Sequence, residues 1–540
     1  MCRNGLSSNN FISGEDKFYH FILLAKDAKG HQQIREISTR AWKRSYSTGK
    51  MIRVPTYYQD LIDIIGADPG HVIGSTACLG GALPTQILRK TSDDDLRSWC
   101  RSMLALFGED NFYLELQPSN NEEQIIVNKK LLQLSSELNI PFIITNDTHY
   151  LKKEDASIHK AYLNSQDGDR EVDSFYATTY LMDTQELESF FDNDNITQMA
   201  YQNIMKIKNS CVDYDLTKPL KIPRLTWRTP IKIANWSYWF DNIPYLQKFV
   251  TSDYEGDHVL AKIIVEKIDE DVTLQNEETY NEINENLKMT WISSEVNKTH
   301  WSAYFLNLQK IIDICWEAGS LVGPGRGSGV GFLLLYILGI TQINPLRETT
   351  PTFAWRFLNP DRVSVLDVDI DIEGGRRPQV LNKFREVYGE DRVANVITFG
   401  TEKSKSAILT AARGLGIDVD IAQYISSLIP SDRGMIRTLS QCYYGDKENG
   451  WAPVGPFVQE MNDNPELWAV AQKIEGLTCR MGIHAGGVIF VDEPFTNSTS
   501  LMKAPDGTIV TAFDLHDDEA VSQYKAHKHL IANQQCYKGR

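Results

Sequence analysis

Long apolar runs are missing from this sequence of 540 residues, and the longest candidate, Phe332 to Ile340, is too short to span a bilayer. The residues after Met1 begin no signal-peptide pattern. Internal repeats and low-complexity tracts are also missing. We therefore expect a cytoplasmic globular protein that has no membrane partner.

Clustered cysteines and excess positive charge are missing as well. The eight cysteines include no Cys-x-x-Cys pair and no zinc-finger spacing, so we expect reduced thiols. The formal net charge is −16, whereas a protein that coats DNA needs Lys and Arg to neutralise phosphates. Any contact with nucleic acid must therefore be local.

Several domains follow from the length and from the 42% hydrophobic content. Residues 1–215 alternate short apolar runs with helical patterns, such as Glu122 to Leu138 followed by Phe142 to Ile144, which predicts α/β architecture. Prolines interrupt 216–245, which predicts a linker. Residues 401–478 have a helical pattern, and short strands return after it.

The segment from Leu366 to Ile372 alternates apolar and acidic residues. A strand with this period of two places Asp367, Asp369 and Asp371 on one face. Their mutual repulsion would be relieved by Mg²⁺, which prefers carboxylate oxygens, and two such ions about 4 Å apart activate a 3′ hydroxyl in polymerases. The alternative is an edge strand whose charges only prevent aggregation. This segment alone does not decide between a metal site and such an edge strand.

A glycine-rich loop, Gly323 to Gly331, precedes the apolar run. Glycines let backbone N–H groups approach phosphate oxygens, and Arg326 and Ser328 add donors. The loop fits neither the Walker A pattern nor a dinucleotide fingerprint. A tight turn would explain two glycines but hardly five in nine residues, and a phosphate loop about 40 residues before a carboxylate strand is typical of a nucleotidyltransferase.

These motifs, in this order and spacing, resemble the bacterial C-family replicative polymerase, the α subunit of DNA polymerase III. The resemblance extends from about Tyr19 to Lys525, and the segments that carry it are Gly323–Ser328, Arg356–Ser364, Asp367–Asp371, Tyr388–Val393, Ile397–Thr401 and Gly482–Val488.

The resemblance implies a multidomain α/β and α+β fold. It has a partial PHP domain of the distorted α/β barrel type, a polymerase-β-like nucleotidyltransferase palm and a helical thumb. The implied domains are the PHP part at 1–215, the linker at 216–245, the palm at 246–400 and 479–526, the thumb at 401–478 and a basic tail at 527–540 that resembles nothing in the family.

The resemblance also assigns roles to particular residues. Asp369 and Asp371 would hold two catalytic Mg²⁺ ions, with Asp367 as a supporting acid. The residues implied to bind the incoming nucleotide or the template are Gly325, Arg326, Gly327, Ser328, Lys405 and Arg413. The alternative interpretation is that Lys405 and Arg413 are two cations on an exposed helix face and bind neither nucleotide nor template. In the family the loop usually continues as Ser-Ala-Ala-Gly-Ser, whereas here Ser328 is followed by Gly329-Val330-Gly331. Leu409 stands where an Arg is common in the family. We therefore expect the nucleotide pocket to be altered.

Both ends depart from the family pattern. The PHP motifs start in mid-domain, and the opening His-x-His motif is absent. We therefore expect the remaining metal ligands to be vestigial and the domain to have no nuclease activity. These ligands are His20, Cys78, Asp147 and His149. Where the family has a Lys-x-Asp segment that completes the metal triad, this chain has Lys525-Ala526-His527. Imidazole is a poor substitute for a carboxylate on Mg²⁺.

We therefore expect a DNA polymerase, with primer-template DNA and dNTPs as partners and a sliding clamp as a partner of the complete protein. The chain would be one fragment of a split polymerase, phage-encoded or bacterial, that polymerises poorly or not at all when alone. The alternatives are a non-catalytic DNA-binding remnant or scaffold and a PHP-type phosphoesterase.

Overall fold

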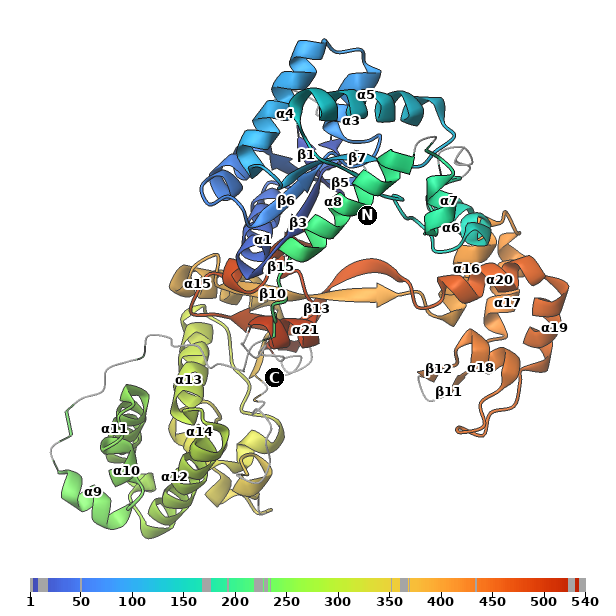
Figure 1. Ribbon diagram of the computed structural model, residues 1–540. Helices are drawn as coiled ribbons and strands as arrows, with labels where there is room; N and C mark the ends of the chain where they lie inside the picture. Colours follow the sequence, from blue (N-terminus) through green and yellow to red (C-terminus); the bar gives the residue numbers. More distant parts are fainter. Residues whose placement is uncertain are drawn as a thin grey trace. The chain divides into compact units, whose positions relative to one another are not determined.

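The structure is a computed structural model, and it describes residues 3–7, 18–48, 51–167, 176–191, 194–217, 227, 232–233, 235–350, 352–359, 368, 370–432, 435–522 and 530–533. The chain divides into two compact units (Figure 1). Unit 1 consists of Met1–Tyr214 and Phe399–Gly482, and unit 2 consists of Asp215–Thr398 and Ile483–Arg540. Both units contain helices and strands, so the mixed α/β class is confirmed.

The first part of unit 1 is built around two sheets. One has the order β3-β6-β7-β8, in which the pairs β6–β7 and β7–β8 are parallel. Its strands are β3 (Ile22–Ala25), β6 (Val72–Ser75), β7 (Phe112–Leu116) and β8 (Phe142–Ile144). The other has the order β2-β1-β5-β4, with β1 (Arg3–Ser7), β2 (Phe18–Tyr19), β4 (Tyr46–Thr48) and β5 (Met51–Tyr57).

Helices alternate with these strands, as the sequence predicts. They are α1 (Ala28–Lys43), α2 (Tyr58–Leu61), α3 (Ala82–Leu88), α4 (Asp93–Phe107), α5 (Glu122–Leu138), α6 (Ala156–Asp167), α7 (Thr184–Glu188) and α8 (Asp194–Ser210). The bounds of α5 follow from local chemistry. The Asn121 side chain accepts a hydrogen bond from the backbone N–H of Glu123, and Asn139 ends the helix in a left-handed conformation.

The second part of unit 1 is helical. It contains α16 (Ser404–Gly414), α17 (Val419–Ser427), α18 (Leu439–Tyr444), α19 (Gly455–Asp463), α20 (Pro465–Ile474) and the hairpin strands β11 (Ser431–Asp432) and β12 (Met435–Ile436). Helix α16 packs on α6 from the first part (Figure 1). A Cβ atom at Gly414 would lie 2.0 Å from the carbonyl oxygen of Ala161, so only glycine permits this approach.

Unit 2 combines a helical part with a small sheet. Its helices are α9 (Trp236–Asn242), α10 (Leu246–Val250), α11 (Glu255–Glu270), α12 (Glu277–Asn297), α13 (Trp301–Glu317), α14 (Leu333–Ile337), α15 (Arg377–Tyr388) and α21 (Leu515–Ser522). Trp239 and Ile243 lie in its hydrophobic core although the sequence predicts a linker there. Pro244 interrupts the helical pattern, but the apolar side chains before it are still buried.

The sheet that unit 2 contributes to has the order β13-β10-β15-β14. Its strands are β10 (Val393–Thr401), β13 (Thr478–Phe490), β14 (Leu501–Lys503) and β15 (Ile509–Thr511). A separate parallel pair joins β9 (Ile370–Glu373) to β16 (Leu530–Asn533). Helix α15 follows β9 and leads into β10, so the acidic strand and the sheet lie on either side of one helix in the sequence.

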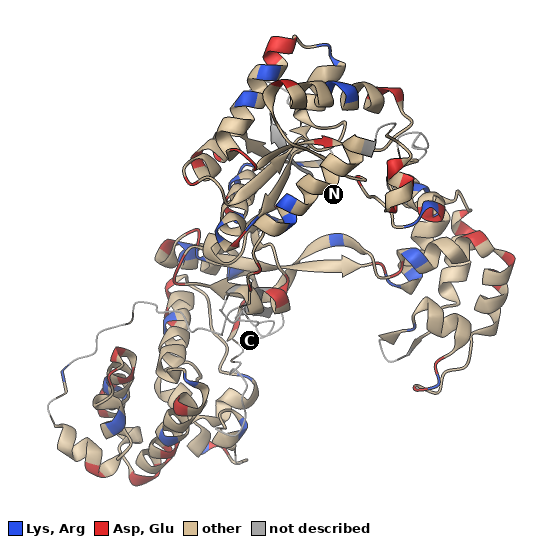
Figure 2. Cartoon of the chain, viewed as in Figure 1, with Lys and Arg blue, Asp and Glu red and all other residues tan. Residues whose placement is uncertain are grey.

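Charged positions of both signs are interspersed along the helices of both units (Figure 2). No helix in the described part of the chain is long and apolar enough to cross a membrane.

Candidate functional site

Strand β9 carries the acidic alternation that the sequence analysis singles out. Ile370 and Ile372 are buried, and Asp371 and Glu373 are partly exposed, so the prediction of a two-faced strand is confirmed for Ile370–Glu373. Asp367 and Asp369 lie outside the described residues. Asp371 is therefore the one predicted catalytic carboxylate whose surroundings can be described.

The start of the glycine loop lies directly against β9. The backbone N–H of Gly323 donates to the carbonyl oxygen of Asp371 at 2.8 Å, and Val322 forms an antiparallel bridge with Ile372. A Cβ atom at Gly323 would lie 2.8 Å from the Cβ of Asp371, which is closer than real Cβ atoms come. The sequence therefore needs glycine here to bring the loop and the acidic strand together.

The carboxylate of Asp371 is largely buried and poorly paired. Its side chain is 16% exposed, and its buried Oδ1 atom has no hydrogen-bond partner. The nearest cation is the guanidinium of Arg326, whose Nη1 lies 3.8 Å from that oxygen. Burying a charge without hydrogen bonds is costly, so this oxygen is suited to a ligand such as a hard metal ion.

The rest of the loop faces solvent before the chain turns inward. Arg326, Gly327 and Ser328 are exposed, and Gly325 and Gly327 have φ angles of +124° and +70°. These angles favour glycine because side chains clash there. Helix α14 then buries its leucines, which confirms the predicted turn into a buried helix. The predicted phosphate-binding residues thus lie on the accessible part of a loop anchored at both ends.

The last described strand, β16, pairs in parallel with β9, and its Ile531 is opposite Asp371. The sequence of β16, Leu530-Ile531-Ala532-Asn533, contains no acid. His527, which stands at the family's third acidic position, lies outside the described residues.

The two predicted basic residues, Lys405 and Arg413, belong to unit 1, whereas Asp371 belongs to unit 2. Both lie on α16. The guanidinium of Arg413 donates to the carbonyl oxygen of Ser165 at 3.3 Å and so ties α16 to α6. This bond favours a packing role for Arg413, while the role of Lys405 stays a prediction.

The predicted PHP ligands lie in pairs in unit 1. The Nδ1 of His20 is 3.1 Å from the Sγ of Cys78, and the Nδ1 of His149 is 2.6 Å from the carbonyl oxygen of Asp147. Burial, followed by the charge of Asp147, raises the pKa of the Cys78 thiol to about 12. In the described part of the chain, no three His, Cys, Asp or Glu side chains are grouped so as to hold a metal ion.

Sequence reasoning missed two polar residues near these ligands. Glu115 on β7 is 6% exposed, and its carboxylate accepts hydrogen bonds from Ser75 at 2.6 Å and Thr145 at 2.5 Å. An acid within the apolar strand Phe112–Leu116 is the signal that could have identified it. His159 on α6 stacks edge-on against His149 and Tyr176, and burial followed by the charge of His149 lowers its pKa. No local pattern marks His159.

Comparisons with known proteins agree with these arrangements. The family model described as "Bacterial DNA polymerase III alpha NTPase domain" matches residues 258–526, and the PHP domain model matches residues 5–119.

Several curated relatives cover most of the chain. The "Probable DNA polymerase YorL" of Bacillus subtilis (strain 168) and the "DNA-directed DNA polymerase" of Bacillus phage SPbeta are each 38% identical over 551 residues, covering 96% of this chain and 41% of the relative. The DNA polymerase III subunit alpha of Thermus aquaticus is 28% identical over 562 residues, covering 94% of this chain and 43% of the relative. The chain thus spans about two fifths of the length of these relatives. It belongs to the bacterial DNA polymerase III alpha family, of which it carries a PHP domain and an NTPase domain.

Proposed function

We propose that this chain carries the nucleotidyl-transfer centre of a template-directed DNA polymerase. The observation that carries the proposal is the contact between the glycine loop and β9, which places the poorly paired carboxylate of Asp371 beside a solvent-exposed loop. The names of the relatives, all DNA polymerases, support the same class of reaction. In this proposal unit 2 contributes the palm, and the helices between 404 and 474 form the thumb.

Two Mg²⁺ ions held by Asp369 and Asp371 fit the donor set, because carboxylate oxygens are the ligands this ion prefers. When bound, such ions activate the primer 3′ hydroxyl and stabilise the leaving pyrophosphate. Asp367 is proposed as a supporting acid. The polymerase would act in the cytoplasm, in a bacterial or phage-encoded replication system.

The chain's own residues bind and orient the substrate. The backbone N–H groups of Gly325, Gly327 and Ser328, together with the Arg326 guanidinium, would hold the triphosphate of the incoming dNTP. Arg326 lies near Asp371 and is 42% exposed, so its guanidinium can turn from the carboxylate to a phosphate while its own donors stay hydrated. Lys405 is proposed to contact the nucleotide or template. Primer-template DNA is the second substrate, and a sliding clamp is proposed only for a longer form.

Primer extension with Mg²⁺ and all four dNTPs tests this function. The variants are the 540-residue chain, the same chain with His527→Asp, a form extended by the downstream coding sequence, and the double variant Asp369→Asn/Asp371→Asn in each. We expect at least one intact form to extend the primer and its double variant to be inactive. Equal activity of the double variant would refute the metal assignment.

Two other functions give different results in the same experiment. A non-catalytic DNA-binding remnant would bind primer-template DNA in every form and extend it in none. A PHP-type phosphoesterase would hydrolyse phosphate esters in a reaction that survives Asp369→Asn/Asp371→Asn and is lost in Cys78→Ala.

A further inference from the structure

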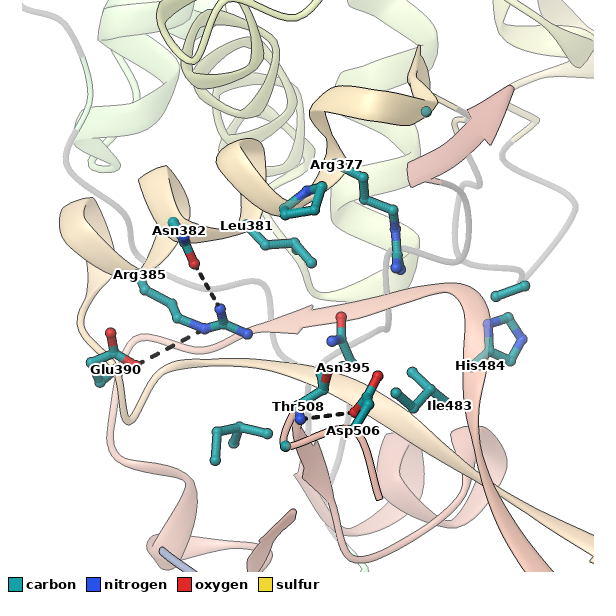
Figure 3. A pocket seen from close by; sticks show the side chains of 15 residues that line it. Arg377, Leu381, Asn382, Arg385, Glu390, Asn395, Ile483, His484, Asp506 and Thr508 are labelled. Atoms are coloured by element: carbon teal, nitrogen blue, oxygen red, sulfur yellow. Dashed lines mark hydrogen bonds and ion pairs between the residues drawn. The ribbon is translucent and has the colours of Figure 1, made fainter. Parts of the chain in front are cut away.

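A polar cavity lies in unit 2, between α15 and the strands β10 and β13 (Figure 3). We call it the Arg377 pocket; its volume is about 510 Å³, and its polar lining includes Arg377, Arg385, Glu390, Asn395, His484 and Asp506. Pockets of about 300–1,000 Å³ are the size that small ligands occupy. Asp371 and the glycine loop do not contribute to its lining, so it is a separate cavity.

Arg377 has hydrogen-bond donors that find no acceptor among the described residues. Its Nε and one terminal nitrogen are buried and make no hydrogen bond, and burial lowers its pKa. Figure 3 shows the side chain extending from α15 into the space above the strands. The two acids of the lining make other contacts: Asp506 accepts from the backbone N–H of Thr508, and Glu390 lies 4.0 Å from the Nε of Arg385. Two buried donors without acceptors are costly, and a bound anion would satisfy them.

Asn395 points into the same cavity from β10 (Figure 3). It is only 2% exposed, and its side-chain oxygen has no hydrogen-bond partner. The oxygen and nitrogen of an amide are assigned from the surrounding hydrogen bonds, and here no acceptor or donor fixes them, so the amide can also present its N–H₂ group to a ligand. Arg377 and Asn395 are thus two buried, unsatisfied groups in one cavity.

Two more features add to the polarity of the cavity wall. The Nδ1 of His484 accepts hydrogen bonds from the backbone N–H groups of Gly487 at 2.7 Å and Gly486 at 3.3 Å, so a neutral ring carries its hydrogen on Nε2. Helix α15 begins at Arg377 with no side-chain cap, and the positive end of its dipole lies at the cavity wall formed by Arg377 and Pro378. The unused donors of Arg377 and the positive end of α15 favour an anion that accepts several hydrogen bonds.

We propose that the Arg377 pocket binds a small oxyanion of the phosphate class, with inorganic phosphate and pyrophosphate as its simplest representatives. A guanidinium offers two parallel N–H donors that match two oxygens of a phosphate group. The site is distinct from the metal-dependent centre at Asp371, and its occupancy does not depend on nucleotide transfer.

Isothermal titration of the full 540-residue chain with pyrophosphate, and separately with inorganic phosphate, tests the proposal. The buffer contains EDTA and no phosphate, so that metal-dependent binding at Asp371 does not contribute. We expect binding to the original chain and at least a tenfold loss of affinity in Arg377→Gln. Arg376→Gln is the matched control, because Arg376 is exposed, precedes Arg377 and does not line the cavity; it should bind as the original chain does.

Folding of the variant is checked by thermal melting in the same buffer. Because the buried donors of Arg377 lack acceptors, Arg377→Gln should leave the melting temperature unchanged or higher. If Arg377→Gln does not fold, Arg377→Lys becomes the test variant. Its ammonium group keeps the charge but lacks the two parallel donors, so this variant should bind phosphate and pyrophosphate about tenfold more weakly than the original chain. Equal binding by the decisive variant, or no binding by the original chain, overturns the proposal.

A single-stranded oligonucleotide distinguishes the source of the phosphate group. If Arg377→Gln loses affinity for the oligonucleotide while phosphate and pyrophosphate never bind, the pocket recognises a DNA backbone and the proposal of a free oxyanion is wrong. Failure of primer extension would not affect any of these measurements, so this inference and the proposed function can fail separately.

Discussion

Two buried carboxylates, Glu115 in unit 1 and Asp371 in unit 2, differ in how they are paired. Glu115 in unit 1 accepts hydrogen bonds from Ser75 and Thr145, whereas the Oδ1 of Asp371 in unit 2 has none. A buried acid whose hydrogen bonds are satisfied contributes to the fold, and one that is left unsatisfied is suited to a ligand.

The largest expected effects come from exchanging each of these two acids for its amide. Asp371→Asn should reduce primer extension by about 10²–10³-fold or more, the loss typical when one group that stabilises charge in the transition state is removed. Its free energy of unfolding should change little, because the lost oxygen had no hydrogen bond.

Glu115→Gln should show the reverse. Its amide nitrogen would replace one of the two acceptor oxygens, so either Ser75 or Thr145 loses its acceptor, which should cost about 1–3 kcal/mol of unfolding free energy with primer extension unchanged. Urea unfolding and primer extension of both variants check the pair. Loss of activity in Glu115→Gln with normal stability would remove the contrast between the two units.

A smaller effect is expected from Gly323→Ala. The added methyl group would meet the Cβ of Asp371 at 2.8 Å, so the loop or the strand must shift, at a cost of about 1–3 kcal/mol. Gly375→Ala is the control, because a Cβ there meets nothing within 4 Å. Urea unfolding gives the stability, and dNTP titration in the primer-extension assay should show a raised KM for Gly323→Ala alone. If both variants behave alike, the close approach of loop and strand is not needed.

The smallest effect concerns His159 in unit 1. Burial lowers its pKa in the folded state below the unfolded value of about 6.5, so protonation favours the unfolded chain. Its contribution is complete above the unfolded pKa and is lost as the pH falls from there through the folded pKa. The unfolding free energy at pH 7.5 and pH 5.5 should therefore differ less in His159→Gln than in the original chain. An equal difference would show that His159 titrates normally.

Local patterns predicted much of the fold from sequence. The helix Glu122–Leu138 and the strand Phe142–Ile144 have the predicted bounds, because the capping residues and the apolar period are local. The same holds for the alternation in Ile370–Glu373 and for the turn from the glycine loop into α14.

The contacts of the candidate sites that join distant segments could not be predicted in this way. Nothing near Gly323 in the sequence indicates that its N–H bonds to Asp371, and nothing near Arg413 indicates Ser165 as its partner. The missed pocket has the same cause, since Arg377, Asn395 and His484 come from one helix and two strands. Each of these residues looks ordinary until the chain has folded.

The packing of α6 against α16 also has a consequence for synthesis on the ribosome. Unit 1 contains Met1–Tyr214 and Phe399–Gly482, so the 184 residues of Asp215–Thr398 are translated before the partner of α6 is available. At about 5–20 residues per second this delay is roughly 10–40 s. During that time the surface around Ala161 has no partner, and a nascent chain halted before Phe399 should be prone to chaperone binding.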